Sequence, residues 1–173
     1  MHVVSSDPTL PKSAAYQELN LQLAGLFAGE NNGLANAANM CALLYHMLTD
    51  VNWVGFYFLQ GSDLVLGPFQ GKVACVRIEL GRGVCGSAAE RREILVVPDV
   101  HDFPGHIACD ADSRSEIVVP LIQRGRLLGV LDVDSPKLAR FDDEDKEGLR
   151  TAADLLLISS QLDHLVAEGI SAS

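Results

Sequence analysis

The chain has 173 residues, 48% of them hydrophobic, which is enough to bury one core and typical of one domain. We expect a single domain over residues 1–173, with a loose N-terminal arm over about residues 1–12. The net charge of −10 and the lack of a Lys/Arg cluster argue against nucleic acid as a partner. The longest apolar run, residues 53–59, is too short to cross a bilayer, and no signal-peptide pattern precedes it. We therefore expect a cytoplasmic protein without membrane association.

Two helices are predicted in the first third of the chain. Residues 13–28 carry apolar side chains at helical spacing, and Gly29 is typical of a helix end. The second helix is expected to bury one face, formed by Leu34, Cys41, Leu44, Tyr45 and Leu48. Since a free cysteine in an apolar stripe is usually a small core residue, Cys41 is predicted to be structural.

Strands are predicted where the hydrophobic period changes to two, at residues 53–59, 64–69, 73–80, 94–97, 116–123 and 127–134. A short helix is expected from near Gly83 to about Arg91. The last two strands are joined by Arg124-Gly125-Arg126, a connection short enough only for an antiparallel hairpin. A closing helix begins at the carboxylates of residues 142–145 and has an apolar face of Leu155, Ile158, Leu162, Leu165 and Val166. The pattern predicts an α+β fold with a largely antiparallel sheet flanked by N- and C-terminal helices.

Carboxylates gather at the end of the last predicted strand. Alternation places Leu128, Val130, Asp132 and Asp134 on one face. A three-residue hairpin loop would put Glu116 opposite Asp134 on that face, whereas a two-residue turn would shift the register. Three converging like charges should raise at least one pKa and leave an acid able to donate a proton near neutral pH, while still attracting an ammonium group.

Two further features could line a binding site. Trp53, Gly55 and Tyr57 share a face of the first strand, and the gap over the glycine could hold a small apolar group such as a methyl. Taken alone, the two aromatic residues are better explained as core residues than as a binding pocket. The turn Gly81-Arg82-Gly83 feeds a helix whose backbone N–H groups could accept a carboxylate, which is a weak signal by itself.

The candidate nucleophile is Cys109, in a long irregular loop from Asp99 to about Ser113. Long loops in compact domains are usually functional, and a cysteine there can be partly exposed. Acidic neighbours disfavour its thiolate, so activation must come largely from protonation of the substrate. Zinc is the rival interpretation, because His101, His106, Cys109, Cys75 and Cys85 could supply ligands, although no Cys-x-x-Cys pair is present.

Several motifs together resemble the free methionine-R-sulfoxide reductases, which are built on a GAF domain, and the resemblance covers nearly the whole chain. The motifs are Trp53-Val54-Gly55-Phe56-Tyr57, Gly67-Pro68-Phe69-Gln70-Gly71-Lys72 with Cys75, Gly81-Arg82-Gly83-Val84-Cys85-Gly86, His106-Ile107-Ala108-Cys109-Asp110, Ser115-Glu116-Ile117-Val118-Val119-Pro120 and Gly129-Val130-Leu131-Asp132-Val133-Asp134-Ser135.

The resemblance implies roles for these residues. Cys109 would be the attacking thiolate, Cys75 the usual resolving cysteine, and Cys85 a third cysteine that stands in as resolver. Glu116, Asp132 and Asp134 would bind the substrate and its sulfoxide oxygen, while Trp53 and Tyr57 would hold its methyl end.

The implied reaction reduces free methionine-R-sulfoxide through a sulfenic acid and an intramolecular disulfide, with thioredoxin as the reductant. No metal or organic cofactor is expected, and a homodimer is possible. The alternatives are a non-catalytic GAF sensor that binds a small molecule, and a zinc-stabilised binding protein.

Overall fold

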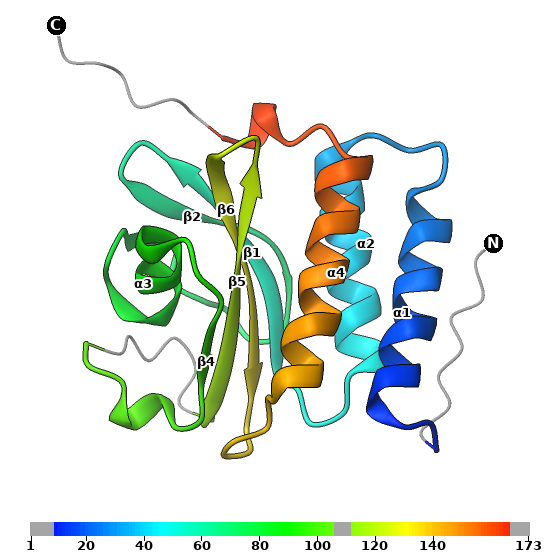
Figure 1. Cartoon of the computed structure of the whole chain (residues 1–173). Coiled ribbons are helices and arrows are strands. Elements are labelled where there is room, and N and C mark those ends of the chain that lie inside the picture. Colours follow the sequence, from blue (N-terminus) through cyan, green and yellow to red (C-terminus); the bar gives the residue numbers. More distant parts are fainter. Residues whose placement is uncertain (1–8, 106–111, 167–173) are drawn as a thin grey trace, which may run out of the picture.

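The computed structural model describes residues 9–105 and 112–166 (Figure 1). The described elements are, in chain order, α1 (Lys12–Phe27), α2 (Gly33–Met47), β1 (Trp53–Gln60), β2 (Asp63–Gln70), β3 (Arg77–Glu79), α3 (Gly83–Arg91), β4 (Leu95–Val97), a 3-10 turn (Val100–Asp102), β5 (Ser115–Gln123), β6 (Arg126–Ser135), α4 (Asp143–Ser159) and a second 3-10 turn (Asp163–Leu165). These residues include no helix that is long and apolar enough to cross a membrane.

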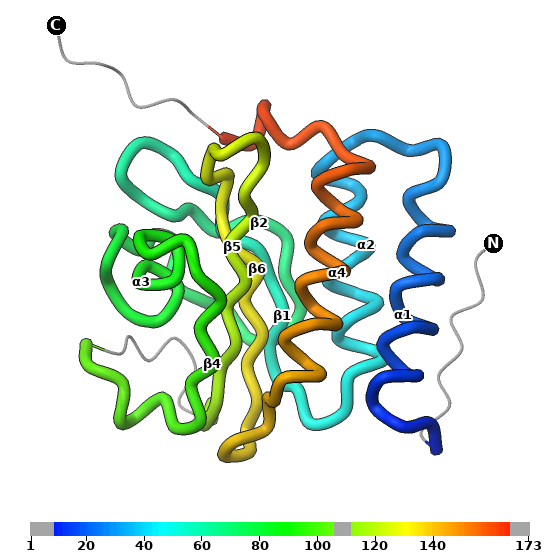
Figure 2. The backbone as a smooth tube through the Cα atoms, in the orientation of Figure 1, coloured from blue at the N-terminus to red at the C-terminus, as the bar shows by residue number. Residues whose placement is uncertain are grey.

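The described strands form one six-stranded sheet in the order β3-β2-β1-β6-β5-β4, and every neighbouring pair is antiparallel. Helices α2 and α4 cover one face of the sheet, with α1 outside them against α4 (Figure 1). The short helix α3 lies on the opposite face, as the tube view also shows (Figure 2). This architecture confirms the predicted α+β fold with a largely antiparallel sheet.

The sheet separates two hydrophobic clusters, because alternate residues of each strand point to opposite faces. Phe56, Ile117 and Leu131 belong to the larger cluster, beneath α1, α2 and α4. Trp53, Tyr57, Val118 and Val130 belong to the smaller cluster, beneath α3. The aromatic residues singled out in the sequence thus lie on the α3 face.

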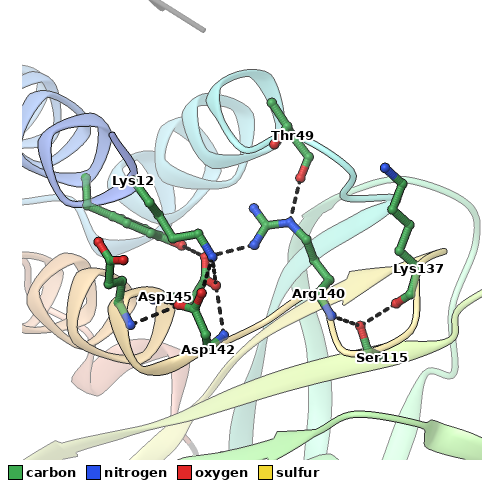
Figure 3. A network of polar contacts seen from close by, with 9 residues as sticks. Lys12, Thr49, Ser115, Lys137, Arg140, Asp142 and Asp145 are labelled. Carbon is green, nitrogen blue, oxygen red and sulfur yellow. Dashed lines mark hydrogen bonds and ion pairs between the residues drawn. The ribbon is translucent and has the colours of Figure 1, made fainter. Parts of the chain in front are cut away.

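An ionic network around the buried Asp145 carboxylate joins α1 to the start of α4 (Figure 3). The Asp145 carboxylate accepts hydrogen bonds from Tyr16 Oη at 2.8 Å, Lys12 Nζ at 2.7 Å and Arg140 at 2.9 Å. Asp142 and Asp145 also form a capping box that satisfies free N–H groups at the α4 N-terminus. The acidic run predicted to begin the last helix therefore also anchors the first helix.

The closing helix is shorter than predicted, and its buried face differs from the expected one. The closing helix ends at Ser159, and Ile158, expected on its buried face, is exposed. It stops because Gln161 N–H bonds Asn31 O, in the α1–α2 connection, at 2.9 Å. Leu162 and Val166 are buried beyond the helix.

On α2, Leu34 and Tyr45 are exposed although Cys41 and Leu44 are buried, because the sheet covers a narrower stripe than the one predicted. The strand expected at residues 73–80 is reduced to β3, which pairs with β2 only from Arg77 to Glu79. Residues 71–76 are instead irregular, and part of this segment is held by side chains from β1, as described below.

Candidate active site

The β5–β6 hairpin has a two-residue turn, yet it places Glu116 opposite Asp134. Arg124 and Gly125 both have positive φ, of 53° and 76°, as in a type I′ turn. A register shift between Leu121 and Ile122 leaves Leu128 as an extra residue on β6, which restores the pairing that a three-residue loop would give. Of the two registers that the sequence left open, the structure has the one that pairs Glu116 with Asp134, although the loop itself has two residues.

The same bulge corrects the predicted face of β6. Val130 lies in the cluster beneath α3, on the face shared with Asp132, whereas Leu128 packs in the cluster beneath α1, α2 and α4. Alternation along the strand fails at Leu128 because a bulge places two consecutive residues opposite one partner.

Glu116, Asp132 and Cys85 form a buried polar cluster between the sheet and α3. Cys85 Sγ and one carboxyl oxygen from each acid all lie within 4.8 Å of one another. Cys85 Sγ donates a hydrogen bond to Glu116 Oε1 at 3.8 Å. All three side chains are buried. Among the described residues, Asp132 Oδ1 has no hydrogen-bond partner. A buried oxygen in this state is unfavourable in the empty protein and is available to a ligand that donates a hydrogen bond.

Burial and mutual repulsion favour the protonated forms of this cluster. Desolvation, then the charges of Asp132 and Asp134, hold the pKa of Glu116 well above its usual range. Burial also raises the pKa of Asp132 to about 7, although hydrogen bonds from Cys85 and Glu116 oppose the rise. The pKa of the Cys85 thiol is raised by burial and by the adjacent acids. The predicted acid with a proton available near neutral pH is therefore present in the structure.

The spacing of the cluster would also suit a divalent cation. Binding one would require the Cys85 thiol to lose a proton that burial and the acids hold tightly. Cys75, another ligand in the zinc interpretation, is in a disulfide and has no thiolate to offer. The zinc interpretation therefore loses Cys75 as one of its predicted ligands.

An aromatic wall stands beside the carboxylates, because β1 pairs Trp53 with Asp134 and Gly55 with Asp132. The Trp53 ring is stacked against Tyr57, with centroids 5.9 Å apart, and against Phe69, at 5.5 Å. The gap predicted over Gly55 is filled by the indole itself: a Cβ there would lie 2.2 Å from Trp53 Cη2. Trp53 folds over its own strand, which alternation cannot reveal.

The segment that carries Cys75 is tied to this wall. Trp53 Nε1 donates to Lys72 O at 3.0 Å, and Tyr57 Oη donates to Cys75 O at 3.1 Å. Cys75 is disulfide-bonded, whereas Cys41 and Cys85 are free. The structure therefore brings Cys75 close to the two aromatic residues predicted to bind substrate.

Two predicted features remain: the glycine-rich turn before α3, and the loop cysteine with its neighbouring histidine. The turn at Gly81 and Gly83 does lead into α3, and Cys85 lies in the first turn of that helix. Gly81 N–H is already bonded to Gly86 O, so only the helix N-terminus itself can meet a ligand. Cys109 and His106 lie outside the described residues.

Two features of the site were missed by the sequence reasoning. Phe69 forms part of the aromatic wall, and the sequence held no signal for it, because Phe69 pairs with Gly55 only after a register shift between Gly55 and Tyr57. Lys72 forms an exposed ion pair with Asp112, which links the Cys75 segment to the far end of the long loop. The two residues of this ion pair are 40 positions apart, so no local sequence pattern indicates it.

The GAF domain family model matches residues 33–159. Free methionine-R-sulfoxide reductase of Escherichia coli is 57% identical over 80% of this chain and 84% of its own length. The Saccharomyces cerevisiae protein of the same name is 45% identical over 88% and 89%. The solved structure of the Neisseria meningitidis enzyme in complex with its substrate is 45% identical, with a TM-score of 0.88 over 92% of this chain and 95% of that one.

The antiparallel sheet and its helices thus form a GAF domain. Within that class, the chain belongs to the free methionine-R-sulfoxide reductase family, and the prediction of an oxidoreductase enzyme is confirmed.

Proposed function

We propose that this chain reduces free L-methionine-R-sulfoxide to L-methionine. The observation that carries the proposal is the buried acid cluster with its unpartnered Asp132 oxygen, placed beside an aromatic wall and a disulfide-bonded cysteine. A substrate with an ammonium group, a polar sulfoxide and an apolar methyl matches these three surroundings. The relatives named above support the same choice of substrate.

Substrate binding is assigned to both sides of the site. Glu116, Asp132 and Asp134 attract the ammonium group and orient the sulfoxide oxygen, while Trp53 and Tyr57 hold the methyl end. The indole covers Gly55 in this structure, so the methyl group packs against the face of the aromatic pair rather than in a gap between them.

The reaction begins with attack of the Cys109 thiolate on the sulfoxide sulfur. An acid among Glu116, Asp132 and Asp134 gives a proton to the oxygen, which transfers to the cysteine as the sulfur is reduced, leaving methionine and a sulfenic acid. The raised pKa of Glu116 and that of Asp132 support this step, because an ordinary carboxyl has lost its proton at neutral pH.

Resolution is assigned to Cys75, whose thiol condenses with the sulfenic acid and expels water. Cys41 and Cys85 are free thiols, which leaves Cys109 as the proposed partner in the Cys75 disulfide. Cys85 is a third catalytic cysteine that hydrogen-bonds Glu116 and stands in as resolver when Cys75 is missing. A cytoplasmic thioredoxin returns the two electrons, and neither a metal nor an organic cofactor takes part.

The test is methionine release from the separate R and S epimers of free methionine sulfoxide, with dithiothreitol as reductant. Wild type should consume the R epimer alone, and Cys109→Ser should abolish turnover. Cys41→Ala is the matched control, because that thiol is buried under α2 and donates only to Pro68 O. No turnover of either epimer by wild type would reject the proposal in favour of a ligand-binding GAF sensor.

A further inference from the structure

Two exposed valines flank the disulfide-bonded Cys75. Val73 has an exposed fraction of 87% and Val76 of 66%, and both are among the most exposed large hydrophobic side chains of the described residues. A single exposed apolar side chain is common on a protein surface, but contiguous exposed apolar area marks sites of interaction, and these two valines lie three residues apart beside a disulfide. Cys75 itself is only partly buried.

Val73 and Val76 are exposed because hydrogen bonds fix the backbone of their segment against the protein. The Trp53 indole and the Tyr57 hydroxyl bind the carbonyls of Lys72 and Cys75, at 3.0 and 3.1 Å, which fixes the backbone toward the protein. Leu66 N–H binds Val76 O at 3.0 Å, where the segment enters β3 at the sheet edge. The Val73 and Val76 side chains remain on the solvent side of a fixed backbone.

Gly71 makes this arrangement possible at the start of the segment. Its φ is +128°, and a Cβ there would lie 2.6 Å from Trp53 Cδ1. The backbone can pass close to the indole only because no side chain intervenes. The position of the valines therefore depends on the aromatic wall and not on strand pairing alone.

We propose that Val73 and Val76 form the docking surface for the dithiol protein that reduces this enzyme, and that its attacking thiolate is delivered to Cys75. The inference rests on the proposed function for the role of the disulfide and for the thioredoxin-type reductant, and adds the docking surface and the sulfur that is attacked. A thioredoxin-type protein fits because its exposed dithiol must reach a partly buried sulfur, and apolar contacts on both sides of that sulfur would hold it there.

The exchange balances in two steps. The partner thiolate attacks Cys75 Sγ, the intramolecular disulfide breaks, and the other cysteine, proposed to be Cys109, leaves as a thiolate. In the second step, the partner's other cysteine attacks, as a thiolate, the partner sulfur that is bonded to Cys75. The mixed disulfide breaks, and Cys75 leaves as a thiolate that takes up a proton. Two electrons pass to the enzyme, and the partner is left oxidised. Attack at Cys75 thus restores the nucleophile directly.

The test follows reduction of the oxidised protein with no methionine sulfoxide present. Wild type, Val73→Ser, Val76→Ser and the double variant are mixed with reduced thioredoxin or with dithiothreitol, and new thiols are counted by alkylation and mass spectrometry. The double variant should react at least tenfold more slowly with thioredoxin and within twofold of wild type with dithiothreitol. Ile158→Ser is the control, since that side chain is 83% exposed on α4 and should change neither rate.

A second measurement identifies the sulfur. Thioredoxin whose second cysteine is replaced by serine should be trapped in a mixed disulfide on Cys75, as peptide mapping would show. Trapping on Cys109, an unchanged thioredoxin rate in the double variant, or equal slowing with both reductants would overturn the docking surface. Because no sulfoxide is used, these results are independent of the epimer assay that tests the proposed function.

Discussion

Glu116 lies directly opposite Asp134 across the β5–β6 ladder, and the bulge at Leu128 is what aligns them. Without the extra residue, the two-residue turn would pair Glu116 with Val133, whose side chain belongs to the opposite face. The bulge thus converts a tight type I′ hairpin into one that gathers carboxyl groups beneath α3. The cost of gathering them is burial of acids that cannot all ionise.

Asp132→Asn should make the protein more stable at alkaline pH while removing activity. The pKa of Asp132 is about 7, above the value of an unfolded carboxyl, so its contribution to stability is complete below about pH 4 and is lost as pH rises through 7. At pH 8 the variant should gain roughly 1–4 kcal/mol in the free energy of unfolding, measured by urea denaturation at pH 5 and pH 8.

Asp154→Asn is the matched control, because Asp154 is exposed on α4 and a surface substitution of this kind should change the free energy of unfolding by no more than about 0.5 kcal/mol. An Asp132→Asn variant that is less stable than wild type at both pH values would mean that Asp132 is ionised and satisfied in the folded protein.

The methionine-release step should slow above about pH 7 once the thiolate content is taken into account. Asp132, whose pKa is about 7, loses its acid form on that side of the profile, whereas the thiolate increases there. Single-turnover rates are measured from pH 6 to 9 and divided by the alkylation rate of Cys109 on the same samples. This quotient should change little near pH 6 and fall about tenfold per pH unit well above pH 7. A quotient that does not change from pH 6 to 9 would exclude Asp132 as the proton donor.

Cys85 should remain a free thiol after one turnover of the wild-type enzyme. It is buried, and the surrounding acids raise its pKa, so its thiolate is scarce. Peptide mapping should find the disulfide at Cys75 in wild type. In Cys75→Ser, a link between Cys85 and Cys109 should form at least 100-fold more slowly, and rapid formation of that link would show that burial does not restrain Cys85.

Gly55→Ala should damage the aromatic wall. Its Cβ would lie 2.2 Å from Trp53 Cη2 and 2.6 Å from Phe69 Cβ, so the indole must move. We expect a loss of about 1–3 kcal/mol in stability and at least a tenfold rise in KM for the sulfoxide. Gly25→Ala on α1 is the same chemical change in open space, and should stabilise the protein by up to about 1 kcal/mol. Equal KM values for Gly55→Ala and Gly25→Ala would show that Trp53 does not contribute to substrate binding.

Asp145→Asn should loosen the attachment of α1. The carboxylate is fully buried and faces two cations, Lys12 and Arg140, which the variant would leave without their anion. Breaking a buried pair in this way typically costs about 3–5 kcal/mol, or on the order of 10 °C in Tm for a chain of this size. Asp143→Asn, on the exposed side of the same helical turn, should shift Tm by less than about 2 °C. Similar shifts in both variants would argue against the network in Figure 3 as the main anchor.

The sequence by itself determined the order of elements and the shared face of Asp132 and Asp134 on β6. Period-two patterns gave the face of Trp53 and Tyr57 on β1 and of Asp132 on β6, because alternation is a local property of an extended chain. The motifs around these positions also carried the family, which the comparisons confirm.

Tertiary structure alone decided three features of the site: the bulge at Leu128, the indole lying over Gly55, and the attachment of the Cys75 segment to Trp53 and Tyr57. It also ended α4 at Ser159, where Gln161 binds the α1–α2 connection instead of continuing the helix. In each case a backbone or side-chain group contacts a residue that the local sequence pattern does not indicate. Such choices depend on which groups the fold brings within hydrogen-bonding or packing distance, and a single strand's periodicity contains no record of them.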